Sequence, residues 1–277
     1  MPTLPLTEAG QGSPLVLIHA FPLDRGMWQA QVDAFADRYR VLTPDVFGFG
    51  TSPLQEEGWT MESMADALAE TLDERGIRDG VILGGLSMGG YISLAFAKRY
   101  PERLRGLILA DTRADADTAE MKTTRNETIE FVKGSSAAAL IEKQLPKMLG
   151  PETLAHRPGV VARVRQLAAK QTVPAVVAAL QALRDRPDST ESLKEFEFPT
   201  LVIVGAEDAI TPPALADAMM RELTHGTLAT IPNAGHLSNL EQPGAFGEVV
   251  RSWLETAAPT QATAPAAPVL GGAAGGR

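Results

Sequence analysis

The sequence contains no cysteine among its 277 residues, which excludes disulfides, thiolate nucleophiles and cysteine-based metal sites. No apolar run approaches the roughly 18 residues of a membrane span, and the N-terminus shows neither the basic nor the apolar region of a signal peptide. Acidic residues outnumber basic ones by 34 to 25, and no basic stripe offers a surface to nucleic acid. We therefore expect a cytoplasmic protein that binds neither nucleic acid nor membrane.

Short apolar segments alternate with helical patterns along most of the chain. Segments rich in Val, Ile and Leu, bounded by Gly, Pro or Asp, predict buried strands at 14–20, 40–45, 80–87, 104–111, 199–208 and 226–232. Helical patterns such as MESMADALAETLDERG and MGGYISLAFAKRY lie between them. This alternation predicts an α/β fold with a mainly parallel sheet and helices on both of its faces.

One long segment breaks the alternation. Residues 112–198 carry helical patterns without a convincing strand, and an insertion of this length is too long for a bare loop. We therefore predict a core formed by 1–111 and 199–256, with 112–198 as a helical cap over one edge of the sheet. Residues 257–277 are rich in Ala, Pro and Gly with almost no apolar anchors, which predicts a disordered tail.

A serine surrounded by glycines follows one of the predicted strands. Residues 85–89, GLSMG, match the pattern G-x-S-x-G, with a strand before the serine and a helix after it. On such a turn a serine is held in a strained conformation that exposes its hydroxyl, and the glycines let strand and helix approach closely. The helix N-terminus also offers free N–H groups to a developing oxyanion. These features favour Ser87 as a nucleophile, and the alternative is a glycine-rich helix start with an N-cap serine.

This turn and four further segments resemble the α/β-hydrolase superfamily over nearly all of residues 14–256. HAFPLD at 19–24 is similar to the oxyanion loop of the superfamily, and PDVFGFGTS at 44–52 is similar to its glycine-rich turn. GAEDAITP at 205–212 is similar to the segment that bears the acid, and NAGHLSNLEQP at 233–243 to the segment that bears the histidine. The likeness is greatest to the branch of 3-oxoadipate enol-lactonases and small carboxylesterases with a helical cap. It implies an α/β-hydrolase fold that needs no metal and no organic cofactor.

A serine nucleophile needs a base, and the base needs an orienting carboxylate. His236 lies in a loop after the last predicted strand, where parallel sheets place their functional loops. Asp208 ends the strand before that, and the order Ser87, Asp208, His236 is the one expected for this fold. The neighbouring Glu207 would point the opposite way. Asp111, at the end of the preceding strand, is the alternative acid.

The predicted oxyanion hole consists of two backbone N–H groups. One belongs to Met88, directly after the nucleophile, and the other to Phe21 in the HAFPLD loop. Ala20 stands where the superfamily usually has glycine, which leaves this loop less free to adopt a positive φ. His19 is expected to brace the same loop by hydrogen bonding.

The predicted substrate pocket is apolar. Its candidate lining residues are Trp28, Phe47, Leu86, Phe131, Leu140 and Leu145, and for the cap residues burial in the core is the alternative. An apolar acyl or alcohol group would then fit better than a charged one. The cap arginines Arg125, Arg165 and Arg184 could pair with a substrate carboxylate, although exposure on a helix is the simpler interpretation.

Together these observations predict a serine hydrolase that cleaves a small ester, lactone or thioester through an acyl-enzyme on Ser87. One alternative is cofactor-free perhydrolase or haloperoxidase chemistry on the same triad. Another is a receptor-like member of the fold that binds a ligand with little turnover. The expected partner is a small-molecule ester or lactone, and the oligomeric state stays open.

Overall fold

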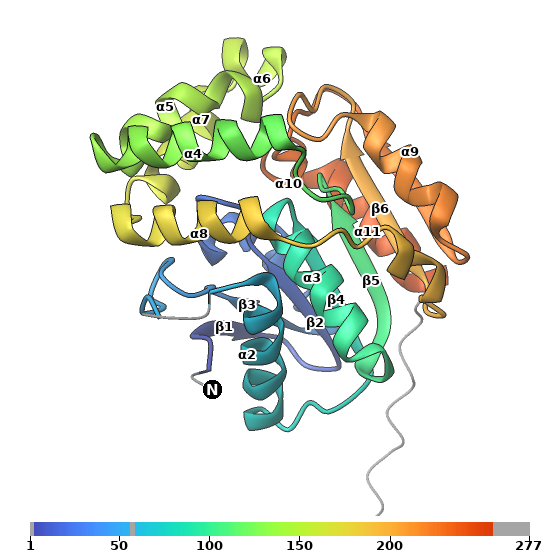
Figure 1. Cartoon of the computed structure of the whole chain (residues 1–277). Helices are drawn as coiled ribbons and strands as arrows, with labels where there is room; N and C mark the ends of the chain where they lie inside the picture. The colour runs from blue at the N-terminus through green and yellow to red at the C-terminus, as the bar shows by residue number, and fades with distance from the viewer. Residues whose placement is uncertain (1–2, 56–58, 257–277) are drawn as a thin grey trace, which may run out of the picture.

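A single twisted sheet forms the centre of the computed structural model, which describes residues 3–55 and 59–256 (Figure 1). The tail predicted at 257–277 lies outside the described residues. The seven strands found in the described part are ordered β1-β3-β2-β4-β5-β6-β7. They are β1 (Leu6–Ala9), β2 (Ser13–Ile18), β3 (Tyr39–Pro44), β4 (Val81–Leu86), β5 (Leu104–Ala110), β6 (Thr200–Gly205) and β7 (Gly226–Ile231).

Six of these strands occupy the predicted segments and pair in parallel, which confirms the predicted α/β class. The sequence did not predict β1, which pairs antiparallel with β3 at the edge of the sheet. Its four residues, LTEA, are all at least partly exposed. An edge strand that short buries too few apolar side chains to leave a recognisable pattern.

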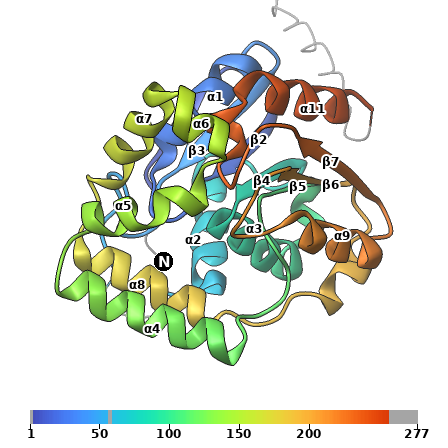
Figure 2. The same cartoon turned by 90° about the horizontal axis from the view of Figure 1, so that it is seen from above.

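Helices cover both faces of the sheet, as Figure 2 shows from above. On one face lie α2 (Met61–Glu74), α3 (Met88–Arg99) and α9 (Pro213–Glu222), and on the other α1 (Gln29–Phe35) and α11 (Pro243–Thr256). The shorter helices of the core are η1 (Arg25–Trp28), η2 (Pro101–Arg103) and α10 (Ser238–Glu241). No helix in the described part of the chain is long and apolar enough to cross a membrane.

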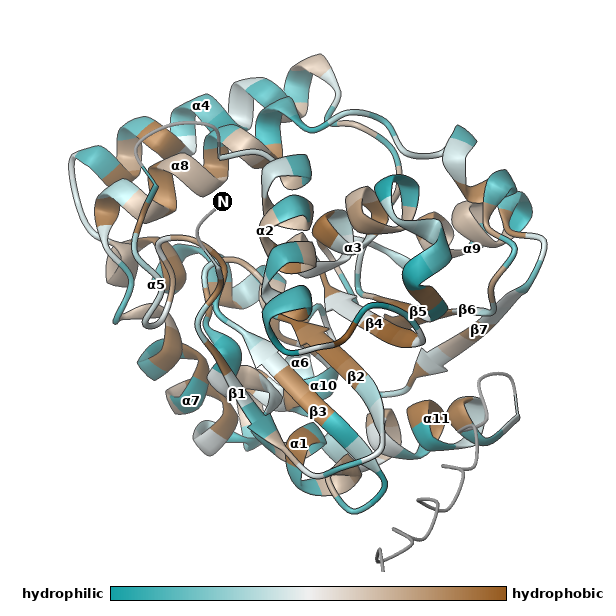
Figure 3. Cartoon of the chain, turned by 90° about the horizontal axis from the view of Figure 1, so that it is seen from below, coloured by the Kyte–Doolittle hydropathy of each residue, from teal (hydrophilic) through white to brown (hydrophobic). Residues whose placement is uncertain are grey.

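The alternation of strand side chains divides the interior into two cores. Along β2, Val16 and Ile18 pack toward α2 and α3, whereas Leu15 and Leu17 pack toward α1 and α11. Figure 3 shows the hydrophobic colour concentrated on the strands and on the helix faces turned toward them. The sheet is therefore a rigid, buried platform, and the loops that follow its strands are held at defined positions.

Five α-helices lie between β5 and β6, and we call them the cap helices. They are α4 (Ala119–Lys133), α5 (Ala137–Met148), α6 (Pro151–His156), α7 (Pro158–Ala168) and α8 (Val173–Asp185), followed by the short η3 (Glu191–Glu195). The side chains of Thr118, Ser136 and Thr172 accept backbone N–H bonds at the starts of α4, α5 and α8, which explains where these helices begin. In Figure 1 the cap helices α4 to α7 lie above the sheet.

Candidate active site

Ser87 forms the turn between β4 and α3, with a φ of 55° and a ψ of −112°. This left-handed conformation is strained for a residue with a side chain. The turn is possible because its flanking residues are glycines. A Cβ on Gly85 would lie 2.1 Å from the backbone carbon of Gly89, and a Cβ on Gly89 would lie 2.2 Å from the carbonyl oxygen of Ile18. The glycines thus allow β4, α3 and β2 to approach closely enough to present the Ser87 hydroxyl.

A continuous line of hydrogen bonds links Ser87, His236 and Asp208. The Nε2 atom of His236 lies 2.8 Å from Ser87 Oγ, and its Nδ1 atom lies 2.8 Å from Asp208 Oδ2. In the tautomer with the proton on Nδ1, His236 donates to Asp208 and accepts from the serine hydroxyl. Asp208 follows β6, and His236 lies in the loop after β7. The structure therefore brings together the three residues that the sequence proposes as a triad.

Asp208 is held in place by three further donors. The backbone N–H groups of Ile210 and Thr211 donate to Oδ1, each at 2.8 Å, and the Thr211 hydroxyl donates to Oδ2 at 2.6 Å. Thr211 also lies 3.2 Å from His236 Nδ1. The sequence analysis did not identify Thr211, although its place three residues after the acid is a signal for such a turn.

Burial and charge have opposite effects on the pKa values of His236 and Asp208. Burial by itself would lower the pKa of His236, but the charge of Asp208 and its hydrogen bond outweigh that effect and raise the pKa above its ordinary value. Burial by itself would raise the pKa of Asp208, but the charge of His236 and the hydrogen bonds from His236 and Thr211 hold that pKa below its ordinary value. The arrangement stabilises the imidazolium that forms when the histidine accepts a proton.

Asp111, the alternative acid, serves a different purpose in the structure. Its carboxylate accepts from the Gly205 N–H at 2.8 Å and from both the N–H and the hydroxyl of Ser238. It thereby ties the end of β6 to the loop that carries His236. Burial, reinforced by the charge of Asp208, raises the pKa of Asp111 to about 8. Among the described residues no hydrogen bond joins Asp111 to His236, and Glu207 is exposed.

The two predicted oxyanion donors belong to α3 and to the loop after β2. Met88 is the first residue of α3, whose first helical bond runs from the Tyr91 N–H to the Ser87 carbonyl at 3.2 Å. The N–H of Met88 therefore precedes the helical ladder. The N–H of Phe21 likewise has no acceptor among the described residues. The absence of an acceptor in the described part of the chain leaves both N–H groups compatible with the predicted oxyanion hole.

The loop that carries Phe21 is braced by His19. The Nε2 atom of His19 accepts from the Val46 N–H at 3.1 Å, and Nδ1 donates to the Ala20 carbonyl at 3.1 Å. Burial lowers the pKa of His19, which keeps the imidazole neutral for these two bonds. Within the described part of the chain, positive φ at a non-glycine residue occurs only at Ser87, Asp111 and Asn233. Alanine at position 20 therefore causes no strain, contrary to the concern raised by the missing glycine.

The Ser87 hydroxyl and His236 face a cavity of about 320 Å³ beneath the cap helices, which we call the catalytic cavity. Phe131 and Leu140 line it, as the sequence predicts, together with Phe21 of the predicted oxyanion loop. The remaining wall differs from the predicted apolar pocket. Polar side chains of α4 and α5 form much of it, namely Thr124, Arg125, Glu127, Thr128, Lys143, Gln144 and Lys147.

The prediction was wrong for four of the lining residues, because each of them packs in a hydrophobic core. The Trp28 ring packs at a tilt against Phe246 of α11, with ring centroids 6.0 Å apart. Leu86 is fully buried in the core on the α1 and α11 side of the sheet. The other two, Phe47 and Leu145, are also buried in the hydrophobic cores. None of the four reaches the catalytic cavity.

Of the three cap arginines, only Arg125 lines the catalytic cavity. Its guanidinium is already paired with buried Asp117 at 3.0 Å. Arg165 pairs with Glu142 at 2.6 Å on the surface, and Arg184 pairs with Asp185 at 2.6 Å. Lys143 and Lys147, which the sequence analysis missed, have no carboxylate partner among the described residues. Within 3–55 and 59–256 there is also no group of three or more His, Asp or Glu side chains that could hold a metal ion.

Comparison with known proteins agrees with the fold. The model of the family described as "alpha/beta hydrolase fold" matches residues 13–243, and the chain belongs to this family. A thermophilic esterase from Thermogutta terrifontis, solved with bound malate, is 41% identical with a TM-score of 0.88, and the match covers 91% of this chain and 93% of that one.

Two enol-lactonases are also similar to the chain. The crystal structure of the enol-lactonase from Burkholderia xenovorans LB400 is 25% identical with a TM-score of 0.84, over 91% of this chain and 96% of that one. 3-Oxoadipate enol-lactonase 2 of Acinetobacter baylyi is 26% identical over 238 residues, which is 86% of this chain and 87% of the relative. The branch of the superfamily that the sequence resembles is thereby confirmed.

Proposed function

We propose that the protein hydrolyses small carboxylic esters or lactones through an acyl-enzyme intermediate on Ser87. The observation that carries the proposal is the unbroken line of bonds from Ser87 Oγ through His236 to Asp208, both links at 2.8 Å. The esterase and the enol-lactonases to which the chain is similar support the same reaction class. A thioester of similar size is compatible with the same chemistry.

The geometry supports a two-step mechanism. Ser87 Oγ attacks the substrate carbonyl carbon while His236 Nε2 takes the proton of the Ser87 hydroxyl. The carbonyl oxygen becomes an oxyanion near the N–H groups of Phe21 and Met88. His236 then gives the proton to the leaving alcohol as the C–O bond breaks. Water, activated by His236, attacks the acyl carbon, and the proton returns to Ser87 as the acid leaves. Asp208 keeps the imidazole in the tautomer that both steps need.

The acyl-enzyme is the part of the proposal that can be tested most directly. Acid quenching during turnover of p-nitrophenyl butyrate, followed by peptide mass spectrometry, is expected to find a butyryl group on the peptide that contains Ser87. A fluorophosphonate probe should label the same residue with about one equivalent per chain, even if acylation limits turnover. Labelling without steady turnover would instead favour a ligand-binding protein, and the absence of any adduct on Ser87 would contradict the mechanism.

The charge of the cavity wall extends the proposal to the substrate. Lys143 and Lys147 lie one helical turn apart on α5 and line the catalytic cavity with Arg125, against the single carboxylate of Glu127. The chain as a whole has a net charge of −9, so the positive charge of this wall contrasts with the negative charge of the protein. Cations without a carboxylate partner favour a substrate that carries an anionic group. The related esterase was solved with malate, a dicarboxylate, bound.

Replacing Lys147 with methionine is expected to lower kcat/KM about threefold to tenfold for a half-ester of a dicarboxylic acid. The same change should alter kcat/KM for a neutral ester by less than about twofold, because a neutral group gains nothing from the lysine. The measurement compares monomethyl succinate with methyl butyrate as substrates. Lys133→Met removes an exposed lysine of α4 that does not line the cavity and serves as the control. Equal losses on both substrates would show that charge recognition is not the role of Lys147.

A further inference from the structure

A second cavity lies beside the catalytic cavity, and we call it the side cavity. Its volume is about 290 Å³, close to the 320 Å³ of the catalytic cavity. One residue, Tyr91, lines both. Tyr91 stands on α3, one helical turn after Ser87, and its side chain borders both the cavity that holds the nucleophile and the side cavity.

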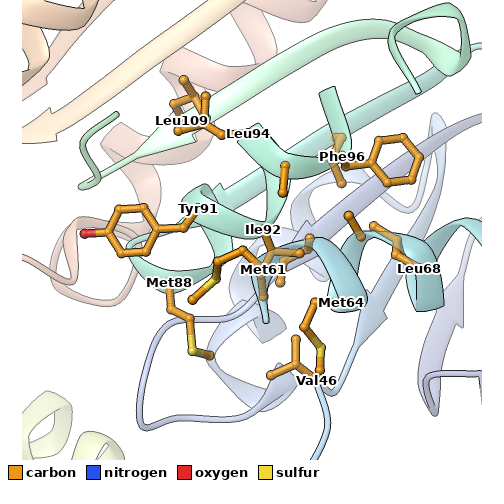
Figure 4. Packing of buried hydrophobic residues seen from close by; sticks show 14 of the residues in the cluster. Val46, Met61, Met64, Leu68, Met88, Tyr91, Ile92, Leu94, Phe96 and Leu109 are labelled. Atoms are coloured by element: carbon orange, nitrogen blue, oxygen red, sulfur yellow. The ribbon is translucent and has the colours of Figure 1, made fainter. Parts of the chain in front are cut away.

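The apolar part of the side cavity's lining comes from two helices and from the segments that connect the cap to the core. Met61 comes from α2, and Tyr91 and Leu94 come from α3, as Figure 4 shows. Ala95 on α3 and Ala114 and Pro187 in the connecting segments complete its apolar surface. The other lining residues are polar or charged, namely Glu62, Lys98, Arg99, Arg186 and Ser189. Lys98 and Arg99 are exposed, whereas Arg186 is buried. The apolar part on α2 and α3 offers a surface to an apolar chain.

Arg186 fixes the position of the Tyr91 ring. Its guanidinium carbon lies 4.1 Å from the centroid of that ring, and its side chain is only 3% exposed. Arg186 is itself anchored by Asp117 at 2.6 Å and by the Leu183 carbonyl at 2.7 Å. A ring held in this way by a buried cation acts as a wall between the two cavities.

We propose that Tyr91 is the partition that limits the chain length of the ester, and that the side cavity is the site which receives an unbranched apolar chain once the partition opens. The inference rests on the proposed esterase function of Ser87. It follows from the apolar residues that α2 and α3 contribute to the side cavity, from the single side chain that lines both cavities, and from the place of that side chain one helical turn after the nucleophile. With Tyr91 in place, substrates are confined to the catalytic cavity.

The test uses p-nitrophenyl butyrate and octanoate for chains on the acyl side, and butyl and octyl acetate for chains on the alcohol side. Tyr91→Ala is expected to raise the ratio of kcat/KM for the long chain over the short one by about tenfold or more in one series, because each additional buried methylene contributes a few-fold. Tyr91→Phe keeps the ring and should keep the wild-type ratio. The series that responds identifies which side of the ester enters the side cavity.

A second substitution locates the chain. Ala95 lines the side cavity but not the catalytic cavity, so that phenylalanine at this position fills only the side cavity. The double variant Tyr91→Ala, Ala95→Phe should return the ratio to the wild-type value. A gain that survives in the double variant, or a folded Tyr91→Ala protein with the wild-type ratio in both series, overturns the inference.

Two controls separate this inference from the function on which it rests. If Tyr91→Ala does not fold, Tyr91→Val makes a milder truncation, and an unchanged ratio in that folded variant overturns the inference equally. Failure of the wild-type protein to cleave butyrate in a manner that depends on Ser87 contradicts the proposed function itself, whereas normal butyrate cleavage with an unchanged ratio contradicts only the role of Tyr91.

Discussion

Ser87→Ala is expected to lower kcat for p-nitrophenyl butyrate by about 10⁴-fold to 10⁶-fold, the largest effect of any single change in the chain. The loss corresponds to about 5 to 8 kcal/mol of transition-state stabilisation. The reason is that the alanine side chain cannot attack the carbonyl, so the acyl-enzyme cannot form. The free oxyanion donors at Phe21 and Met88 remain and account for whatever rate is left above the uncatalysed reaction.

The stability of the Ser87→Ala protein separates loss of chemistry from loss of fold. Alanine at position 87 keeps the Cβ that makes the φ of 55° strained, so the turn is neither relieved nor further strained. Only the hydrogen bond to His236 is lost, which corresponds to about 1 kcal/mol or less. A thermal melt should therefore stay within a few degrees of the wild type. Retention of wild-type activity by Ser87→Ala would exclude the mechanism.

Ser93→Ala is the matched control for this experiment. Ser93 lies on the same helix and is fully buried. Its hydroxyl donates to the Gly89 carbonyl at 2.8 Å and contacts no member of the proposed triad. We expect kcat to remain within about threefold of the wild type, because removing such a helix back-bond leaves the ladder intact. A loss as large as that of Ser87→Ala would indicate that packing around α3, and not the nucleophile, controls activity.

The positions of strands β2 to β7 and the residues that follow them could be predicted because both are local properties of the sequence. Each of these strands is a short segment with Gly, Pro or Asp near at least one of its ends, and the parallel pairing brings the carboxyl ends of β4, β6 and β7 to one edge of the sheet. Ser87, Asp208 and His236 follow these three strands. The proximity of these three residues therefore follows mainly from the sheet, whose strands are clearly marked in the sequence, and less from the conformations of the loops.

The lining of the cavity could not be predicted in the same way, because it depends on which face each cap helix turns inward. Leu140 and Leu145 stand on the same helix, α5, yet only Leu140 reaches the catalytic cavity. Five residues correspond to a rotation of about 140° around a helix, so the two side chains point in different directions. Hydrophobicity is equal for both, and only the packing of α5 against its neighbours distinguishes them.

Asp208→Asn is expected to lower kcat by about 10⁴-fold with little change in KM. Asparagine is close in shape to aspartate, but its amide nitrogen would place a donor where His236 Nδ1–H also donates. The imidazole then turns to the other tautomer and can no longer accept the proton of Ser87. In the wild type the acid limb of kcat/KM should lie above the ordinary histidine value of about 6.5, because Asp208 raises the pKa of His236.

Measuring kcat and the acid limb of kcat/KM for Asp111→Asn decides whether Asp208 or Asp111 is the catalytic acid. Because burial raises the pKa of Asp111 to about 8, this carboxyl is largely protonated near neutral pH, and a neutral asparagine replaces it with little electrostatic change. We expect kcat to stay within about tenfold of the wild type, since Asp111 orients the His236 loop only through Ser238. In Asp208→Asn the charge that raises the histidine pKa is gone, so the acid limb of the residual activity should move to lower pH. If Asp111→Asn showed the 10⁴-fold loss and the shifted limb while Asp208→Asn stayed active, Asp111 would be the catalytic acid.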